Sequence, residues 1–279
     1  MDAETVRQAL KKALLELNPR DSWPVNLHGL LSRLGIRLLL ESTTSRGESY
    51  LELSQPPVIL VQRENPGLFL SSRERFSIAH ELAHWVVWRR FGAVPSSQAE
   101  YWFHENLCNE FAAGLLVPQP ALNNFLKKLN DQGIEPVSFP SRVAQCGAVS
   151  WEVAAKSIAL NPLRDSAYLR LEIFPPRSST YGRNPATAFK VNCSTVLNSS
   201  GSFIGKAAII RDELDFIAWM NELRPREVKS RAVTLLLGAL RLTNVHCTFL
   251  RESDFWHVHF RPSFGGIEIQ NSRVATEAC

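Results

Sequence analysis

Two histidines with a glutamate beside the first stand in the segment RFSIAHELAHWVV, residues 75–87. His80 and His84 are four positions apart, so on an α-helix both imidazoles lie on one face and can bind one metal ion. Glu81 is turned enough to reach a water beside that metal rather than the metal itself. A metal lowers the pKa of such a water, and a carboxylate takes its proton. The pattern predicts a zinc hydrolase with Glu81 as general base; the alternative is an ordinary helix carrying two histidines.

A catalytic zinc needs a third protein ligand and one open position. The segment HENLCNEFAAGLLVP, residues 104–118, is the natural source, because it reads as a helix that can pack against the first. Its chemistry leaves four candidates open: His104, Glu105, Asn109 and Glu110. Tyr101 and His104 lie near enough in sequence to stabilise an oxyanion, although a structural role is the expectation for both.

The helices that must position these residues have recognisable ends. Ser71 and Glu74 form a capping-box pattern and Gly92 is a stop signal, which predicts a helix over about 72–91. A second helix is predicted over about 98–116. A third, ALNNFLKKL, has Pro120 in its first turn. Helical spacing also covers residues 3–17 and the segment NLHGLLSRLG, which ends at Gly35.

Three short strands are predicted between these helices: IRLLLES, SYLEL and PVILVQ. Pro56 and Pro57 favour the sheet edge for the last of them. In HExxH peptidases an exposed sheet edge receives the substrate as an added strand. The residues proposed to bind substrate in this way are Val58, Ile59, Leu60 and Val61, and an ordinary core strand is the alternative for the segment Val58 to Gln62.

The two helical motifs together resemble the ImmA/IrrE family of metallopeptidases. That family's pattern is R-F-(T/S)-x-A-H-E-x-x-H followed by E-x-x-(A/C)-N-x-F-A-A-x-L-L-x-P. The first half is matched by Arg75, Phe76, Ser77, Ala79, His80, Glu81 and His84. The second half is matched by Glu105, Cys108, Asn109, Phe111, Ala112, Ala113, Leu115, Leu116 and Pro118. The resemblance covers roughly residues 25–160, about half of the chain.

The resemblance implies that Glu105 is the third ligand. Asn109 stands one turn later, so it would hydrogen-bond a ligand or cap the adjoining loop, supporting the site from behind. The implied metal is zinc, and the ligand set also tolerates manganese or iron. The implied fold is α+β: a zincin-like helical domain with a small sheet over 1–132, a helix-turn-helix segment over 133–163, and a C-terminal α/β, GAF-like sensor domain over 164–279.

The segment SRVAQCGAVSWEVAAKSIAL, residues 141–160, fits the helix-turn-helix, with Ser150 as N-cap of its second helix. That helix carries Lys156 as its one cation, so a structural or protein-binding role is favoured over direct DNA readout. Further on, helices are predicted at about 212–223 and 225–240. In the strand FWHVHF, His257 and His259 share one face; half-exposed polar positions are favoured over a metal pair.

Composition sets the remaining bounds. The chain has 279 residues, a formal charge of +4 and five scattered cysteines, without a CxxC pair that would indicate a cysteine zinc site. Its charged start, MDAETVRQALKKALLEL, lacks a secretory signal, and no apolar run is long enough to cross a bilayer, so a cytoplasmic protein without a membrane partner is expected.

These observations predict a zinc endopeptidase. By the resemblance, its substrate is a helix-turn-helix transcriptional repressor whose cleavage switches on a stress, DNA-damage or mobile-element response, and a small-molecule or other signal would bind the C-terminal domain. The alternative is a non-catalytic sensor or DNA-binding transcriptional regulator on a peptidase scaffold.

Overall fold

The helix that carries the two histidines begins and ends where local chemistry dictates. In the computed structural model α3 spans Ser72–Phe91. The Ser71 side chain accepts a hydrogen bond from the Glu74 N–H, and the Glu74 carboxylate accepts one from the Ser71 N–H, which completes the capping box. Gly92 ends the helix in the left-handed region at φ 61°. The predicted bounds of this helix are confirmed.

The structure describes mixed helices and strands, as the α+β prediction requires. The described residues are 3–17, 23–43, 48–63, 69–92, 95, 97–161, 167–172, 195–196, 203–204, 224–237, 240–252, 255–261 and 266–269. Contacts divide the chain into two units, one of Met1–Asp131 with Ser141–Ser157 and one of Gln132–Pro140 with Ile158–Cys279. The predicted domain boundaries stay predictions.

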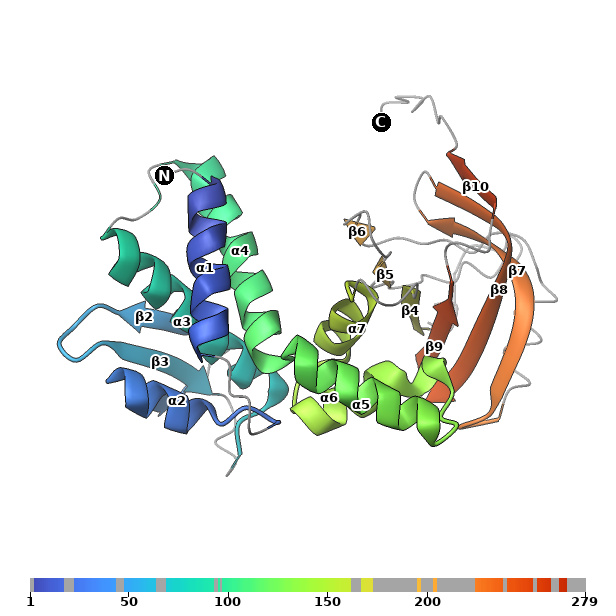
Figure 1. The fold of residues 1–279 in the computed structure, drawn as a ribbon, viewed down its shortest axis with the longest axis horizontal. Coiled ribbons are helices and arrows are strands. Elements are labelled where there is room, and N and C mark those ends of the chain that lie inside the picture. The colour runs from blue at the N-terminus through green and yellow to red at the C-terminus, as the bar shows by residue number, and fades with distance from the viewer. Residues whose placement is uncertain are drawn as a thin grey trace, which may run out of the picture. The chain divides into compact units, whose positions relative to one another are not determined.

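In the first unit, α4 (Gln98–Leu116) packs against both α3 and α1 (Ala3–Leu17), as Figure 1 shows. Leu107, Phe111 and Leu115 of α4 are buried, because they recur at helical spacing on the face that meets these neighbours. The packing of α4 on α3 brings the two motif segments to one place.

A small sheet lies beside α3. It contains β1 (Arg37–Ser42), β2 (Ser49–Glu52) and β3 (Val58–Arg63) in the order β1-β3-β2. Strand β3 pairs parallel with β1 and antiparallel with β2. α2 (Leu27–Leu34) precedes the sheet and ends at Gly35, as predicted.

The prediction that the Val58 to Gln62 segment forms a sheet edge is wrong. β3 is the central strand, and Val58, Ile59, Leu60 and Val61 are all 5% exposed or less. A continuous apolar run is typical of a strand covered on both faces. The two prolines precede the ladder, and Pro57 still joins it through its carbonyl, which accepts the Arg37 N–H at 2.9 Å. The substrate-binding role given to these four residues therefore loses its basis.

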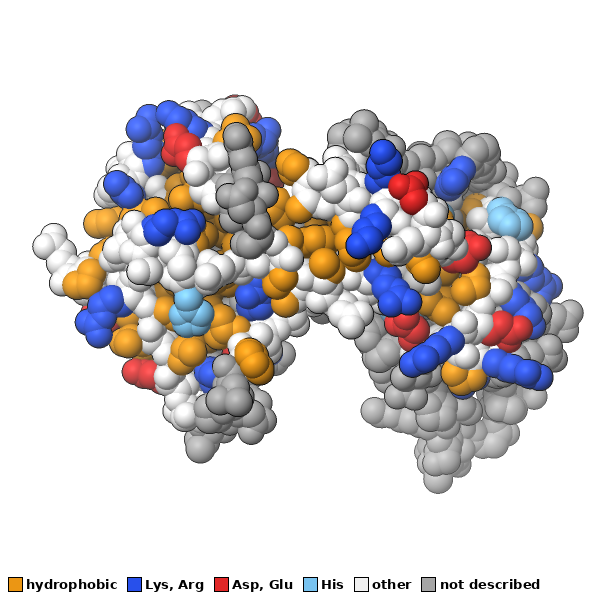
Figure 2. All heavy atoms as spheres, turned by 60° about the horizontal axis from the view of Figure 1, so that its bottom comes forward, with side chains coloured by type: hydrophobic (Ala, Val, Ile, Leu, Met, Phe, Trp, Pro, Cys, Tyr) orange, Lys and Arg blue, Asp and Glu red, His pale blue; other side chains and the backbone are white. Residues whose placement is uncertain are grey.

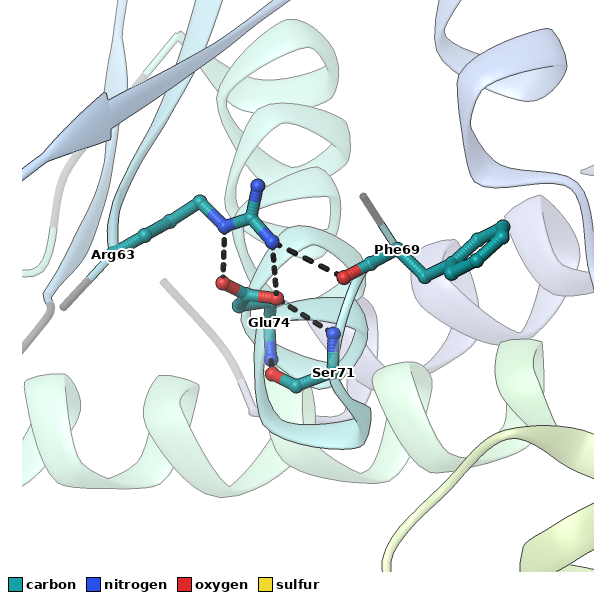
Figure 3. Close-up of polar contacts among 4 residues, drawn as sticks. All are labelled: Arg63, Phe69, Ser71 and Glu74. Atoms are coloured by element: carbon teal, nitrogen blue, oxygen red, sulfur yellow. Dashed lines mark hydrogen bonds and ion pairs between the residues drawn. The ribbon is translucent and has the colours of Figure 1, made fainter. Parts of the chain in front are cut away.

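A buried ion pair fixes the start of α3 to the end of β3 (Figure 3). The Arg63 guanidinium donates to both carboxylate oxygens of Glu74 and to the Phe69 carbonyl, the latter at 3.1 Å. Burial alone would raise the pKa of Glu74, but hydrogen bonds from Arg63 and Ser71 hold it below its ordinary value. The same carboxylate thus caps α3 and joins it to the sheet.

A second arginine connects α3 to the loops on its other side. Arg75 donates to the Val25 carbonyl at 2.9 Å and to the Ala148 carbonyl at 3.1 Å. Val25 precedes α2, and Ala148 lies in the turn after α6 (Phe139–Gly147). Arg75 is the first residue of the first motif. Its two contacts join separate segments of the chain, which gives this motif position a structural role.

The segment predicted as a helix-turn-helix contains the two short helices expected. α6 is followed by α7 (Trp151–Ala159), and the Val153 N–H donates to the Ser150 hydroxyl at 3.3 Å, which confirms Ser150 as the N-cap. Before them lie α5 (Gln119–Asp131) and a 3₁₀ turn, η1 (Pro136–Ser138). Most side chains of α7 are buried, namely Trp151, Ala154, Ala155, Ser157, Ile158 and Ala159. Its role toward DNA stays a prediction.

The second unit contains an antiparallel sheet. Its strands are β4 (Ala167–Glu172), β5 (Thr195–Val196), β6 (Phe203–Ile204), β7 (Val228–Leu237), β8 (Leu240–Glu252), β9 (Phe255–Phe260) and β10 (Gly266–Ile269). The helix predicted over 225–240 is wrong, because Val228–Leu237 of this range forms β7 and pairs along β8. The helix predicted over 212–223 lies outside the described residues. His257 and His259 are 3% and 7% exposed, so the expected half-exposed positions are in fact buried.

Two further observations bear on partners. Among the described residues, every helix is too short or too polar to cross a membrane. In Figure 2, the Lys and Arg side chains on the part drawn at the left are separated by hydrophobic and neutral side chains.

Candidate metal centre

Three ligand-type side chains meet where α3 packs on α4. The Nε2 atoms of His80 and His84 are 3.0 Å apart. One carboxylate oxygen of Glu105 lies 3.2 Å from the Nε2 of His80, and the other lies 3.2 Å from the Nε2 of His84. Of the four candidates on the second motif segment, Glu105 is the one whose carboxylate lies beside both histidines.

These distances suit a metal ion. Bonds of about 2.0–2.1 Å at tetrahedral angles place two zinc ligand atoms roughly 3.4 Å apart. The ligand atoms of His80, His84 and Glu105 all lie within 4.8 Å of one another, and within the described parts of the chain this is the one group of its kind. Two imidazoles and one carboxylate leave a fourth position open, which is the ligand count of catalytic zinc sites.

In both histidines the Nδ1 atom, on the side of the ring away from the other ligand atoms, contacts a residue of α4, and these contacts orient the rings. His80 Nδ1 lies 3.0 Å from the Asn109 side-chain oxygen, and His84 Nδ1 lies 3.7 Å from the Cys108 sulfur. The amide oxygen only accepts, so His80 Nδ1 donates to it, and Nε2 is the ring nitrogen on the side of His84 and Glu105. Of the two roles considered for Asn109, the structure supports the hydrogen bond to a ligand.

The charge state of His84 also favours metal binding. Burial lowers the pKa of His84, and the neighbouring His80 lowers it further. A neutral imidazole is the form that binds a metal. The Nε2 atoms of both histidines and the Glu105 carboxylate meet at this one place, so a cation bound there would contact all three side chains.

Glu81 is adjacent to this group but belongs to a different set of contacts. Glu81 is 8% exposed, and its carboxylate accepts a hydrogen bond from the Ser49 hydroxyl at 2.9 Å. Burial raises the pKa of Glu81, and the negative charge of Glu105 adds to the rise, while donors from Ser49 and the Leu51 N–H oppose it. A carboxylate that lies beside the ligands without joining them has the geometry of a proton acceptor.

The other candidates take different places. The negative charge of Glu105 raises the pKa of Tyr101, whose hydroxyl also hydrogen-bonds that carboxylate, and Tyr101 is 45% exposed. His104 is 3% exposed, so its imidazole is not presented to a substrate. Glu110 is exposed on α4. Tyr101 is therefore the one of the two oxyanion candidates that borders the centre from the solvent side.

Two contacts could not be expected from the motifs. Ser49 lies in a strand 32 residues before Glu81, and nothing in its local sequence marks it. Cys108 is part of the second motif, but its contact with His84 follows only once α4 is placed on α3. Burial, together with the charges of Glu105 and Glu81, raises the pKa of Cys108 to about 12, so this side chain is a thiol at neutral pH.

Comparisons with known proteins leave the family open. No family model matches the chain, and a search of curated proteins finds no match. Among solved structures, the chain is similar to a Mycobacterium tuberculosis transcriptional regulator at 15% sequence identity and a TM-score of 0.48, covering 99% of this chain and 92% of that one. A similarity of this size carries no conclusion about function. The ImmA/IrrE assignment stays a resemblance carried by the motif residues.

Proposed function

We propose that this chain is a zinc-dependent endopeptidase, with His80, His84 and Glu105 as metal ligands and Glu81 as general base. The observation that carries the proposal is the convergence of three metal-binding side chains with a fourth, buried carboxylate beside them. The two motifs that resemble the ImmA/IrrE family support the same assignment. On this proposal, the first unit contains a zincin-like peptidase domain.

The roles of the residues follow from their chemistry. Zinc, when bound, supplies a Lewis acid that polarises a peptide carbonyl and makes water more acidic; manganese or iron would suit the same ligands. Glu81, with a raised pKa, accepts a proton from the attacking water and passes it to the leaving amine. Asn109 and Cys108 hold the two imidazoles in orientation from behind.

The substrate class comes from the resemblance: a helix-turn-helix transcriptional repressor, cleaved to start a stress, DNA-damage or mobile-element response. An extended segment of that substrate would pair with a sheet edge. Because β3 is central, the edge nearest Glu81 is β2, which contacts α3. The helix-turn-helix segment would orient the substrate, and the C-terminal part would be a GAF-like sensor for a signal ligand.

The test compares metal content and cleavage in four full-length proteins: wild type, Glu105→Ala, Glu81→Gln and Glu110→Ala. Wild type should hold about one equivalent of zinc, as a single mononuclear site requires. Glu105→Ala should lose the metal, and Glu81→Gln should keep the metal but not cut candidate repressors. Glu110→Ala, an exposed glutamate on the same helix, should match wild type in both.

The alternative is a non-catalytic transcriptional regulator that uses the peptidase fold as a scaffold. The name of the structural neighbour falls in this class, although its TM-score is too low to transfer the function. In that case Glu81→Gln would behave like wild type in a reporter assay of gene expression, and purified wild type would leave every candidate repressor intact. This result would replace the peptidase proposal.

A further inference from the structure

The contact between Ser49 and Glu81 joins the edge of the small sheet to the proposed general base. The Ser49 hydroxyl donates to the Glu81 carboxylate at 2.9 Å, and the Leu51 N–H donates to the same carboxylate. Both donors lie on β2, and the acceptor lies on α3, next to a metal ligand. Neither Ser49 nor Leu51 belongs to the two motif segments, whereas Glu81 belongs to the first.

The hydrogen-bond pattern of the sheet shows which way the Leu51 amide points. In an antiparallel pair, residue pairs that exchange both backbone hydrogen bonds alternate with pairs that exchange none. The Gln62 N–H donates to the Glu48 carbonyl at 2.8 Å, so the opposite pair Glu48–Gln62 is a bonded one. The pair Leu51–Ile59 stands an odd number of positions further along and is therefore not bonded. The Leu51 N–H points away from β3, toward the open edge of the sheet.

The open edge of β2 therefore has a specific acceptor for this amide. An edge strand normally offers its outward N–H groups to water or to another strand. Here the Glu81 carboxylate occupies that place, and the Ser49 hydroxyl binds it from the neighbouring position. Two donors on one strand restrict the rotation of the carboxylate more than either would alone, because hydrogen bonds to an ionised group are the stronger kind.

We propose that Ser49 is a positioning residue for Glu81: its hydroxyl, together with the Leu51 N–H, holds the carboxylate in the orientation that faces the metal centre. The inference rests on the proposed function in that Glu81 is taken as the general base. The inference adds Ser49, which lies outside both motifs, to the proposed site. It also makes β2 part of that site, through the Ser49 side chain and the Leu51 backbone N–H.

The first measurement is hydrogen exchange of the Leu51 amide by NMR in the full-length, zinc-loaded chain. Glu81→Ala should speed exchange at Leu51, because its acceptor is gone. Ser49→Ala should speed it about tenfold by loosening Glu81, and Ser49→Thr, which keeps the hydroxyl, should restore slow exchange. Ser54→Ala is the matched control, because that hydroxyl binds the Pro56 carbonyl in the same hairpin and does not contact Glu81.

The second measurement is cleavage of whichever repressor wild type cuts. Ser49→Ala should lower kcat about tenfold with KM and zinc affinity unchanged, and Ser49→Thr should recover most of the loss. Leu51 exchange that is identical in Ser49→Ala and wild type would overturn the inference. Failure of the proposed function is a separate outcome: Glu81→Gln would then match wild type in cleavage, while the exchange rates would still decide whether Ser49 holds Glu81.

Discussion

The Nδ1 atom of His80 lies 3.0 Å from the side-chain oxygen of Asn109, which is one helical turn beyond Glu105, the third proposed ligand. One helix thus supplies both a proposed ligand, Glu105, and the group that contacts another proposed ligand, His80. This relationship explains why an asparagine is useful at that position: its carbonyl oxygen accepts the Nδ1 proton without adding negative charge to a site that already contains two carboxylates.

Removal of the Asn109 acceptor should weaken metal binding. Asn109→Leu keeps the number and branching of the non-hydrogen side-chain atoms but leaves His80 Nδ1 without an acceptor, and the zinc affinity should fall about 10–100-fold. Asn109→Asp keeps an acceptor and should stay closer to wild type. Cys108→Ala should have a smaller effect than Asn109→Leu, because sulfur is a weak acceptor and lies 3.7 Å from His84. Competition with a chromogenic chelator measures each affinity, and equal affinities for Asn109→Leu and wild type would contradict the expectation.

The thiol of Cys108 should resist modification in the folded protein. Burial and nearby negative charge raise its pKa to about 12, so at pH 8 it is protonated as well as enclosed. Iodoacetamide should therefore label Cys108 far more slowly than the half-buried Cys146, and urea should abolish the difference. Mass spectrometry of the two peptides reads both rates. Rapid labelling of native Cys108 would mean that α4 separates from α3 on the time scale of the reaction.

Local chemistry made the helices predictable. The ends of α3 follow from Ser71, Glu74 and Gly92, all of which act within one turn of the position they define. The His80–His84 pair needed only helical spacing, and the convergence of Glu105 required in addition that α4 pack on α3. The residues in each of these features lie within one helix or on two helices that pack together, so their distance in space follows from their spacing in the sequence.

Strand order and strand pairing were not predictable in the same way. Whether Val58–Arg63 lies at an edge depends on where β1 and β2 pair, and flanking prolines say nothing about those partners. Val228–Leu237, inside the segment predicted as a helix, forms a strand because β8 supplies a long pairing partner, which overrides its helical appearance. Ser49 reaches Glu81 only through the sheet. In each case the deciding partner is distant in sequence.

The ion pair between Arg63 and Glu74 should stabilise the fold. Arg63 is 7% exposed, so Arg63→Met would leave a nearly buried carboxylate without its partner and should lower the free energy of unfolding by about 3 kcal/mol. Arg37→Met, at an exposed arginine on β1, should change it by about 0.5 kcal/mol or less. Urea unfolding at pH 7 measures both. Equal stabilities of the two variants would mean that the capping box alone determines the start of α3.

The same pair predicts a dependence on pH. The pKa of Glu74 is lower in the folded chain than its ordinary value of 4.5. A carboxyl with a lowered folded pKa stabilises the fold above its unfolded pKa, and this stability is lost as the pH falls through the folded value. The difference in unfolding free energy between wild type and Arg63→Met should therefore be full at pH 6 and shrink below pH 4.5. A difference that grows on acidification would have the wrong sign.

A tryptophan restricts the end of α6 to glycine. A Cβ placed on Gly147 would lie 3.0 Å from the Trp23 Nε1 and 3.1 Å from two ring carbons. The indole has little freedom to move, since its N–H donates to the Leu116 carbonyl at 3.0 Å and its ring meets the edge of Phe125. Gly147→Ala should therefore destabilise the chain by about 1–3 kcal/mol. Gly114→Ala is the comparison, because its Cβ would meet only a movable methyl of Leu14 at 3.2 Å, and thermal unfolding should show it to be the milder change. Should Gly147→Ala unfold at the wild-type temperature, the indole would have room that its contacts do not indicate.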